Sequence, residues 1–188
     1  MRVISGKFKK KKLLLPDPII TRPLRDYIKE SIFNLLTHSK ILNFEFKNSK
    51  ILDIFSGSGS FGIECISRGC SHVTFLEKEK EIINILCKNI KNLSIENKYE
   101  IIERDILKID LSKLAEKKFD LLFLDPPFKY IFLDKLFEKL STNYEALSES
   151  LVLVHYENTN KYSFDKFLNI LIKKKYGRSR VIFGKIKK

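Results

Sequence analysis

The chain has 188 residues, of which 44% are hydrophobic and 31% are charged, so it can form one domain with a packed core and a small appendage. It carries 36 Lys and Arg residues against 23 Asp and Glu residues, and its net charge of +13 predicts attraction to a polyanion. Nucleic acid is the first choice of polyanion and an anionic membrane surface the second, although AT-biased coding would also enrich the chain in lysine. No apolar run approaches the length that spans a membrane, which excludes membrane-spanning classes.

The cysteines and histidines form no recognisable site. An odd number of cysteines without a C-x-x-C pair argues against a disulfide framework or a zinc site, so we expect free thiols at Cys65, Cys70 and Cys87. The histidines are scattered and predict no metal ion: His38, His72 and His155. The basic N-terminus lacks the apolar core of a signal peptide. We therefore expect a cytoplasmic protein.

The first part of the chain predicts a β-hairpin over residues 2–15 and a helix that opens at residues 21–23 and runs to about His38. A lysine run usually marks a solvated face, and that interpretation stays open here. Because this run lies on a hairpin of an already basic chain, we favour contacts to nucleic acid phosphates. The predicted contacts are Lys7, Lys9, Lys10, Lys11, Lys12 and Arg22.

From residue 41 onward, strand and helix patterns alternate. The predicted strands are residues 50–55, 72–77, 99–104, 119–124 and 150–156, and the predicted helices are residues 60–69, 79–92, 111–116, 131–140 and 163–169. Two apolar runs around Gly177 predict a closing antiparallel pair. We predict an α/β fold with a doubly wound, Rossmann-like sheet, in which residues 1–40 are an N-terminal extension and residues 41–188 the main domain. Ligands of such sheets bind at the carboxyl ends of the strands.

A glycine-rich turn follows the first predicted strand. Gly57, Gly59 and Gly62 match the G-x-G-x-x-G spacing of a nucleotide-binding turn. A Cβ in such a turn would keep a ligand away from the backbone, and the next helix offers free N–H groups at its start. The same spacing also occurs in plain connections between a strand and a helix, so the motif by itself leaves both interpretations open.

Acidic residues accompany the ends of the first three strands. Glu77 follows Asp53 by 24 residues, which suits a carboxylate that receives both ribose hydroxyls of an adenosine. Asp105 could accept a hydrogen bond from the adenine amino group. Asp53 lies in an otherwise apolar strand and needs a partner, which the amine of a cofactor would supply. Each of the three also has a plainer interpretation, in which its carboxylate caps nearby backbone amides.

The segment Asp125-Pro-Pro-Phe128 is the most specific signal in the chain. Its two prolines fix φ twice and remove two N–H donors after a buried strand, which leaves the Pro126 carbonyl free beside the Asp125 carboxylate. Two such acceptors can hold an exocyclic amino group, while Phe128 stacks on the base that carries it. We predict that Asp125, Pro126, Pro127 and Phe128 form the catalytic corner. The alternative is a proline turn without chemistry.

These motifs resemble those of class I methyltransferases that use S-adenosylmethionine and act on exocyclic amines of nucleic acid bases. Further matching segments occur in the same order along nearly the whole chain: Arg2-Val-Ile-Ser-Gly6, Thr21-Arg-Pro23, Asp26, Glu30, Phe33-Asn34, residues 53–59, residues 62–69 and Asp125-Pro-Pro-Phe128. In these the sequence is similar to the bacterial 16S rRNA (guanine-N2)-methyltransferase D family, the RsmD type. Leu24-Arg25 and Tyr27 depart from the family pattern, which affects substrate contacts expected in the N-terminal helix.

The resemblance implies methyl transfer from S-adenosylmethionine to N2 of one guanine in 16S rRNA, within an assembling small ribosomal subunit. It also implies a sheet with the strand order 3-2-1-4-5-7-6, in which strand 7 is antiparallel. The implied cofactor contacts are Asp53, Phe55, Gly57, Ser58, Gly59, Glu77 and Asp105. We expect a monomer that needs neither a metal nor a membrane.

Other functions remain to be separated from this one. A DNA adenine-N6 methyltransferase uses a similar proline corner, but 188 residues leave no room for a large sequence-reading domain. A nicotinamide-dependent dehydrogenase would have the same glycine spacing, but the segment Asp125-Pro-Pro-Phe128 argues against this class. A basic RNA-binding module without catalysis is the non-enzyme alternative.

Overall fold

The computed structural model describes residues 1–17, 24–127, 132–157 and 162–188. Helices and strands alternate along most of the chain: α1 (Asp26–His38), β1 (Lys50–Ile54), α2 (Ser60–Ser67), β2 (His72–Glu77), α3 (Lys80–Asn92), β3 (Tyr99–Glu103), the 3-10 turn η1 (Ile106–Lys108), α4 (Leu111–Ala115), β4 (Leu121–Leu124), α5 (Leu133–Ser141), α6 (Tyr144–Leu147), β5 (Leu151–Glu157), β6 (Leu168–Tyr176) and β7 (Ser179–Ile186). Within these described ranges, no helix is long and apolar enough to cross a membrane.

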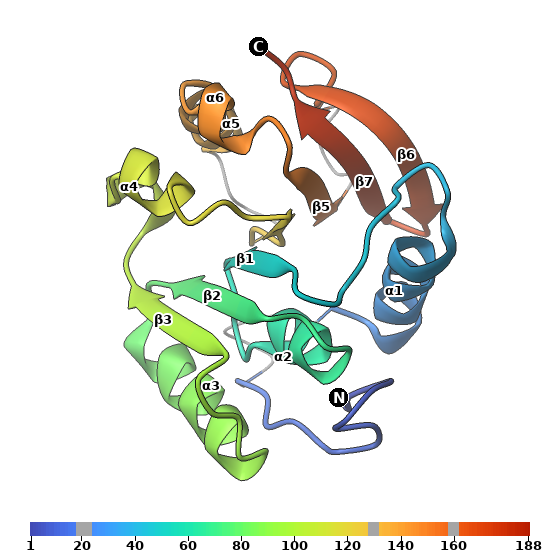
Figure 1. Ribbon diagram of the computed structural model, residues 1–188, viewed down its shortest axis with the longest axis vertical. Coiled ribbons are helices and arrows are strands. Elements are labelled where there is room, and N and C mark those ends of the chain that lie inside the picture. Colours follow the sequence, from blue (N-terminus) through green and yellow to red (C-terminus); the bar gives the residue numbers. More distant parts are fainter. Residues whose placement is uncertain (18–23, 128–131, 158–161) are drawn as a thin grey trace.

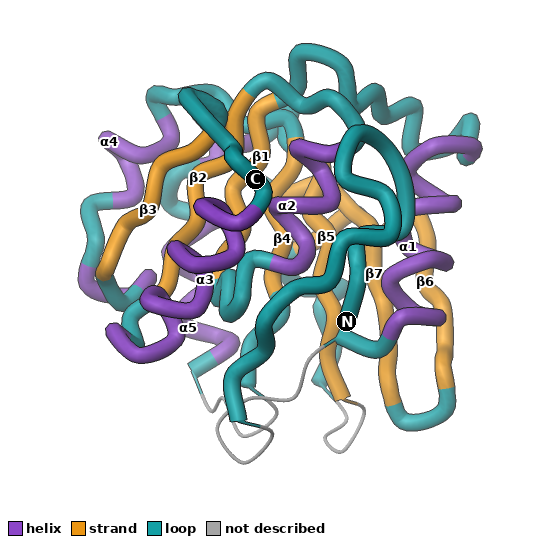
Figure 2. The backbone as a smooth tube through the Cα atoms, turned by 90° about the horizontal axis from the view of Figure 1, so that it is seen from below, coloured by secondary structure: helices purple, strands orange, loops and turns teal. Residues whose placement is uncertain are grey.

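One seven-stranded sheet organises the molecule, with the order β3-β2-β1-β4-β5-β7-β6. Strands β1 to β5 pair in parallel, and β7 runs antiparallel between β5 and β6. Figure 2 shows this order across the sheet, from β3 at one side to β6 at the other. The predicted fold class, strand order and antiparallel strand 7 are therefore confirmed.

Helices cover both faces of the sheet. Helices α1, α2 and α3 supply apolar side chains to the core on one face, and α4, α5 and α6 supply the core on the other (Figure 1). Strand β4 feeds both cores because successive side chains alternate between faces: Leu121 and Phe123 lie in the first, and Leu122 and Leu124 in the second. A strand buried on both faces is apolar at every position, as the sequence of β4 predicted.

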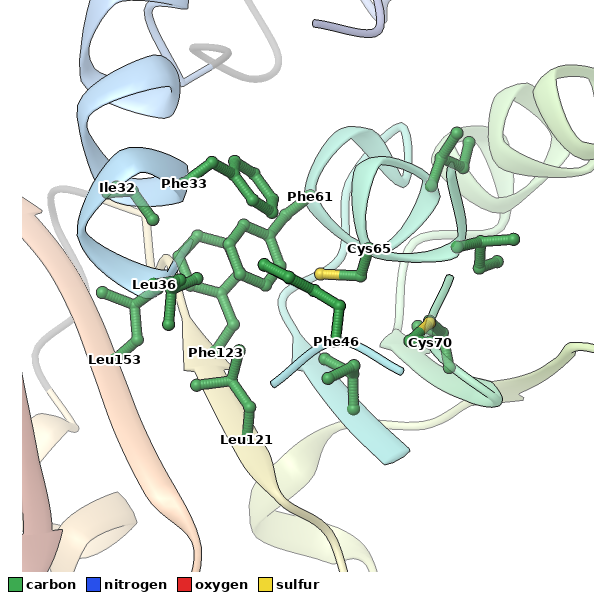
Figure 3. Close-up of a cluster of buried hydrophobic side chains, with 14 of the residues drawn as sticks. Ile32, Phe33, Leu36, Phe46, Phe61, Cys65, Cys70, Leu121, Phe123 and Leu153 are labelled. Atoms are coloured by element: carbon green, nitrogen blue, oxygen red, sulfur yellow. The ribbon is translucent and has the colours of Figure 1, made fainter. Parts of the chain in front are cut away.

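A stack of aromatic rings fixes α2 against the strand that precedes Asp125. Phe61, in the first turn of α2, lies over Phe123 of β4 with ring centroids 3.8 Å apart and an interplanar angle of 20°. Phe33 of α1 packs on Phe61 at 5.0 Å, and the three rings occupy the centre of the cluster in Figure 3. Contacts between aromatic rings can contribute more than their buried area alone. The start of α2 is therefore held in a fixed position relative to the end of β4.

The predicted hairpin over residues 2–15 forms only in part. The segment turns back on itself, and Val3 bonds to Lys11 and Lys10, but the described residues contain a single bridge pair, Arg2 with Lys12. The reason is that several backbone amides between Ile4 and Phe8 bond to α2 instead of pairing across the segment. Gly6 approaches this helix so closely that a Cβ would lie 1.8 Å from the Ser67 carbonyl oxygen.

A buried carboxylate of α2 anchors the same segment. Glu64 accepts hydrogen bonds from the backbone N–H of Ile4 at 2.7 Å and of Ser5 at 2.9 Å. Its charge is balanced by Arg68 at 2.9 Å and by the fully buried Lys29 of α1 at 3.8 Å. Backbone amides that would pair across a hairpin are satisfied by this carboxylate instead.

The predicted helix over residues 163–169 is wrong. The chain makes one turn there, with hydrogen bonds from Phe167 and Leu168 to the Phe164 carbonyl, and β6 begins at Leu168. The apolar spacing that suggested a helix serves this turn, because Phe164 and Phe167 pack on Phe137 of α5 at 5.1 and 5.6 Å. The short elements η1 and α6 were not predicted. The predicted helix start at residues 21–23 is also wrong, because α1 begins at Asp26 and the preceding Arg25 is extended. Residues 21–23 themselves lie outside the described residues.

Candidate active site

The predicted site residues meet at one edge of the sheet. Parallel pairing places Ile54 of β1 beside Leu76 of β2 and Leu124 of β4, so the residues that follow these strands are neighbours. Parallel strands present their carboxyl ends at the same edge. That edge carries Asp53, Phe55, Gly57, Ser58, Gly59, Glu77, Asp105, Asp125, Pro126 and Pro127. Phe128 and Arg22 lie outside the described residues.

The glycines of the turn have different structural reasons. Gly57 has a φ of 56°, and a Cβ there would meet nothing closer than the Phe55 carbonyl oxygen at 3.9 Å, so this side of the turn is open. At Gly59 and Gly62 a Cβ would come within 2.3 Å of side-chain carbons of Leu86 and Phe75. Gly57 thus leaves room for a ligand at the backbone, whereas the other two let α2 pack closely.

Two acids hold this turn in place. Asp53 accepts a hydrogen bond from the Gly62 amide at 3.0 Å, and Glu77 accepts one from the Gly57 amide at 3.0 Å. Glu77 also receives the amides of Lys78 at 2.8 Å and Glu79 at 3.1 Å. The capping interpretation of both acids is therefore seen in the structure. Their contacts with a cofactor stay a prediction.

Asp105 caps η1 by accepting from the Leu107 amide at 2.9 Å. A cleft opens between the ends of β1, β2 and β3, and Asp105 lies on its wall with Glu77 and Phe55. Its other lining residues are Ile54, Leu76, Lys78, Arg104 and Ile106. Four of the lining side chains are apolar and four are charged, and the two carboxylates can accept hydrogen bonds from a base or a sugar. Sequence reasoning missed Lys78, Arg104 and Ile106, although each directly adjoins a predicted acid.

Buried polar atoms without a partner gather at this edge. Among the described residues they are Asp53 Oδ1, Ser56 Oγ and His155 Nε2. Asp53 is only 1% exposed, and burial raises its pKa well above the ordinary value, with the charges of Asp125 and Glu77 adding to the rise and the Gly62 hydrogen bond opposing it. An unsatisfied buried oxygen is costly, so this carboxyl group fits a ligand that brings a hydrogen-bond donor or a positive charge.

The Asp125 corner is held by a residue that the sequence did not single out. His155 lies near the end of β5, and its Nδ1 is 2.7 Å from Asp125 Oδ1. The register explains the contact, since Leu124 of β4 pairs with Val154 of β5 and the next residue of each strand is the acid or the histidine. Pro126 is buried and Pro127 is exposed. The one available signal was a polar residue in an otherwise apolar stretch.

Comparisons with known proteins agree with this architecture. The family model described as conserved hypothetical protein 95 matches residues 1–185. Ribosomal RNA small subunit methyltransferase D from Buchnera aphidicola subsp. Baizongia pistaciae is 36% identical over 159 residues, which cover 85% of this chain and 77% of that protein. The chain belongs to the ribosomal RNA small subunit methyltransferase D family. The methyltransferase D of Escherichia coli K12 is 30% identical over 162 residues, covering 85% of this chain and 76% of its own.

A solved structure from Escherichia coli has the same fold as this member of the methyltransferase D family. It superimposes with a TM-score of 0.77 at 24% identity and covers 100% of this chain and 98% of its own. The sequence comparisons thus confirm the family resemblance, and the solved structure confirms the fold. No group of three or more metal-ligating side chains is found within the described ranges.

The lysine turn, which is the turn that carries the lysine run at residues 7–12, lies away from the carboxyl edge. Lys7 donates its backbone N–H to the carbonyl of Ser67, the last residue of α2, at 2.8 Å. Helix α2 begins at the glycine turn and has 8 residues, so its two ends are roughly 12 Å apart at about 1.5 Å per residue. The exposed lysines are Lys7, Lys9, Lys10, Lys11 and Lys12. They therefore lie about one helix length from the glycine turn, and their contact with nucleic acid stays a prediction.

Proposed function

We propose that this protein transfers a methyl group from S-adenosylmethionine to the exocyclic N2 of a guanine in the 16S RNA of the small ribosomal subunit. Family membership supports an activity on ribosomal RNA. The observation that carries the specific chemistry is the position of Asp125, a carboxylate fixed at the end of β4 and next to the glycine turn that follows β1. Asp125, which would accept a hydrogen bond from an amino group, therefore lies next to the glycine turn where a methyl donor would bind.

The residues of the turn and the cleft fit S-adenosylmethionine, which supplies an electrophilic methyl group when bound. Asp53 would meet the amine-bearing end of the cofactor with its unsatisfied oxygen. Asp105 would accept from the adenine amino group. Phe55, Gly57, Ser58 and Gly59 would contact the cofactor along the turn, which is open at Gly57. A net positive charge near Asp53 would also lower its raised pKa.

Glu77 would hold the ribose, with one restriction that the structure adds. A carboxylate has about four lone-pair positions. Three are used by the amides of Gly57, Lys78 and Glu79. One ribose hydroxyl can therefore bind without displacing a backbone donor, whereas binding both hydroxyls would require one of these amides to move.

At the other side of the edge, Asp125 would accept one N–H of the guanine amino group and the Pro126 carbonyl the second. Holding both hydrogens would direct the nitrogen lone pair toward the methyl group that bound S-adenosylmethionine supplies. The nitrogen would lose one proton on methylation, and the Asp125 carboxylate that holds it is a charged acceptor for that proton. Orientation of this kind contributes up to about 7–11 kcal/mol for well-held reactants. Phe128 would stack on the base.

The proposal extends to the N-terminal part of the chain. Lys7, Lys9, Lys10, Lys11, Lys12 and Arg22 would bind RNA phosphates, with residues 1–40 acting as the RNA-binding extension of the domain 41–188. Support comes from the exposure of these lysines and from the fastening of the segment to α2, which fixes them relative to the glycine turn. Phosphate contacts position a protein on RNA without selecting the base.

A methyl-transfer assay tests the proposal. The purified protein is incubated with labelled S-adenosylmethionine and with small subunits from cells that lack the enzyme, with bare 16S rRNA and duplex DNA in parallel. We expect label in the RNA of the subunits, recovered as N2-methylguanosine at one position. Label in adenine of duplex DNA would instead support the DNA methyltransferase alternative, and label in another nucleoside of the RNA would reject the guanine assignment.

A further inference from the structure

A buried histidine contacts the proposed catalytic carboxylate from the neighbouring strand. His155 is 4% exposed, and its ring nitrogen Nδ1 lies 2.7 Å from Asp125 Oδ1. The parallel register of β4 and β5 puts the two residues at equivalent positions, one step beyond the pair Leu124 and Val154. The contact therefore belongs to the sheet itself and does not depend on how a loop is arranged.

The chemistry of the pair fixes where the histidine carries its hydrogen. An ionised carboxylate only accepts hydrogen bonds, so Nδ1 must be the protonated nitrogen of the ring. The other nitrogen, Nε2, is buried and has no hydrogen-bond partner among the described residues. Between the two neutral tautomers, the one with its hydrogen on Nδ1 donates to Asp125 and leaves only an acceptor without a described partner at Nε2, and this is the tautomer that we expect.

This hydrogen bond gives the two oxygens of the Asp125 carboxylate different roles. Oδ1 is occupied by the ring, so the carboxylate cannot rotate freely about its bond to Cβ. Within the described part of the chain, Oδ2 is the oxygen left to receive a substrate N–H. Without such a partner, the carboxylate would sample several orientations about its bond to Cβ. A displacement of about 1 Å in a reacting group can lower a rate by roughly 100-fold.

We propose that His155 is a positioning residue, which donates from Nδ1 to Asp125 Oδ1 and thereby aims Oδ2 at the amino group that is methylated. The inference rests on the proposed function, because it assigns Asp125 the role of amine acceptor. His155 does not touch the substrate in this arrangement. It acts through the carboxylate, in the way that outer partners orient the ligands of a metal.

The position of His155 supports a selected role. Strand β5 is otherwise formed by buried apolar residues up to Val154, and a buried polar side chain lowers stability unless it is paired. A leucine or valine would continue the core at no such cost. At the place where β5 meets Asp125, the chain therefore keeps a polar ring with one nitrogen that has no partner among the described residues.

Kinetics of matched variants test the role. His155→Leu introduces an apolar side chain of similar size and removes the hydrogen-bond donor to Asp125. We expect kcat to fall about 10- to 100-fold, as is typical when a residue that orients a functional group is removed. The dissociation constant for S-adenosylhomocysteine and the KM for RNA should change by no more than about two-fold. His155→Asn places an amide N–H at the position of Nδ1 and should recover most of kcat, although it fills less of the core.

The comparison of the two variants separates positioning from packing. His155→Asn leaves the larger cavity, so a purely structural role predicts that it is the worse of the two in both melting temperature and kcat. A kcat of His155→Leu equal to that of the unchanged protein, or a His155→Asn variant no better than His155→Leu, would overturn the proposal.

A second readout needs no substrate and separates this inference from the proposed function. In a protein labelled with ¹⁵N-histidine, we expect the NMR shifts of His155 to show a protonated Nδ1 and a bare Nε2, and Asp125→Ala to move the hydrogen toward Nε2. A hydrogen on Nε2 in the unchanged protein would reject the pair. Failure of the unchanged protein to methylate ribosomal RNA, with the expected NMR result, would reject the proposed function while the Asp125–His155 pair stands.

Discussion

The two ends of the catalytic edge hold their carboxylates in different ways. At β1 and β2, Asp53 and Glu77 accept hydrogen bonds from backbone amides of the glycine turn and the start of the next helix. At β4 and β5, Asp125 receives a side chain, His155, from the adjacent strand, and two prolines without N–H groups follow it. One end is built mainly from backbone donors close in sequence, and the other from a contact across the sheet.

The difference matches the task proposed for each end. Backbone amides in a tight turn have little freedom and make a rigid seat, which suits a cofactor that binds in the same way in every cycle. A carboxylate aimed by one side chain keeps an oxygen for a substrate that arrives and leaves. Mutations at the first end should therefore alter cofactor affinity, and mutations at the second should alter turnover.

The largest expected effect is at the acceptor end. Asp125→Ala removes the proposed amine acceptor, and we expect kcat to fall by about 100-fold or more because the amino group is no longer oriented. Calorimetric titration should give a dissociation constant for S-adenosylhomocysteine within about three-fold of the unchanged protein. Asp134→Ala, at an exposed aspartate of α5, is the matched control. A parallel loss of turnover and cofactor binding would remove the distinction between the two ends.

At the cofactor end, Glu77→Gln replaces one carboxylate oxygen by an NH2 group. This group cannot accept the hydrogen bonds that backbone N–H groups donate to Glu77. We expect cofactor affinity to fall about ten-fold, equivalent to about 1.4 kcal/mol, with kcat at saturating cofactor close to that of the unchanged protein. Glu79→Gln changes the same charge at an exposed neighbouring side chain and should have little effect. A variant with lowered kcat and normal affinity would show that Glu77 belongs functionally with Asp125.

RNA binding beyond the edge is expected to respond more weakly. The double variant Lys9→Gln and Lys11→Gln should lower affinity for 16S rRNA several-fold and flatten the dependence of affinity on salt, because each phosphate contact releases counterions. The two substitutions avoid Lys10, whose backbone is in the left-handed region with a φ of 70°, and Lys12, which forms the β-bridge with Arg2. The control is the double variant Lys88→Gln and Lys91→Gln on the exposed side of α3, which removes the same amount of charge. If both double variants show the same dependence of RNA affinity on salt concentration, the effect comes from net charge and not from the lysine run.

The smallest expected effect concerns stability and pH at Asp53. Its pKa is raised by burial, so its contribution to stability is present at low pH and is lost as the pH rises through the folded-state pKa. Asp53→Asn avoids this loss and should melt a few degrees higher than the unchanged protein at pH 8 without cofactor, with the gain shrinking toward pH 4. Its cofactor affinity should be lower.

A second aspartate gives the opposite sign and serves as the control. Hydrogen bonds from Ser112 lower the pKa of Asp110 at the start of α4. Asp110→Asn should therefore melt lower than the unchanged protein at neutral pH, with the difference vanishing in acid. Thermal melts of both variants across this pH range check the assignment, and a gain for Asp53→Asn that does not vary with pH would contradict it.

Much of the edge was predictable because its parts are local in sequence. The spacing of Gly57, Gly59 and Gly62 after an apolar strand, and an acid at the end of each of the first three strands, follow from the way a strand, a turn and a helix connect. The predicted helix over residues 163–169 failed for the converse reason. Its apolar spacing is served by a single turn packed on α5, and a spacing of three and four does not distinguish that turn from a helix.

The sequence by itself determined the α/β architecture, the glycine turn and the acids that follow the strands, since apolar periodicity and backbone restrictions act between residues close along the chain. The tertiary structure decided the rest. His155 meets Asp125 only through the register of two parallel strands, Glu77 has most of its lone pairs occupied only when β2 lies beside the glycine turn, and the lysine turn bonds to the far end of α2. Such contacts join residues that are distant in sequence, and no local pattern encodes which of them become neighbours.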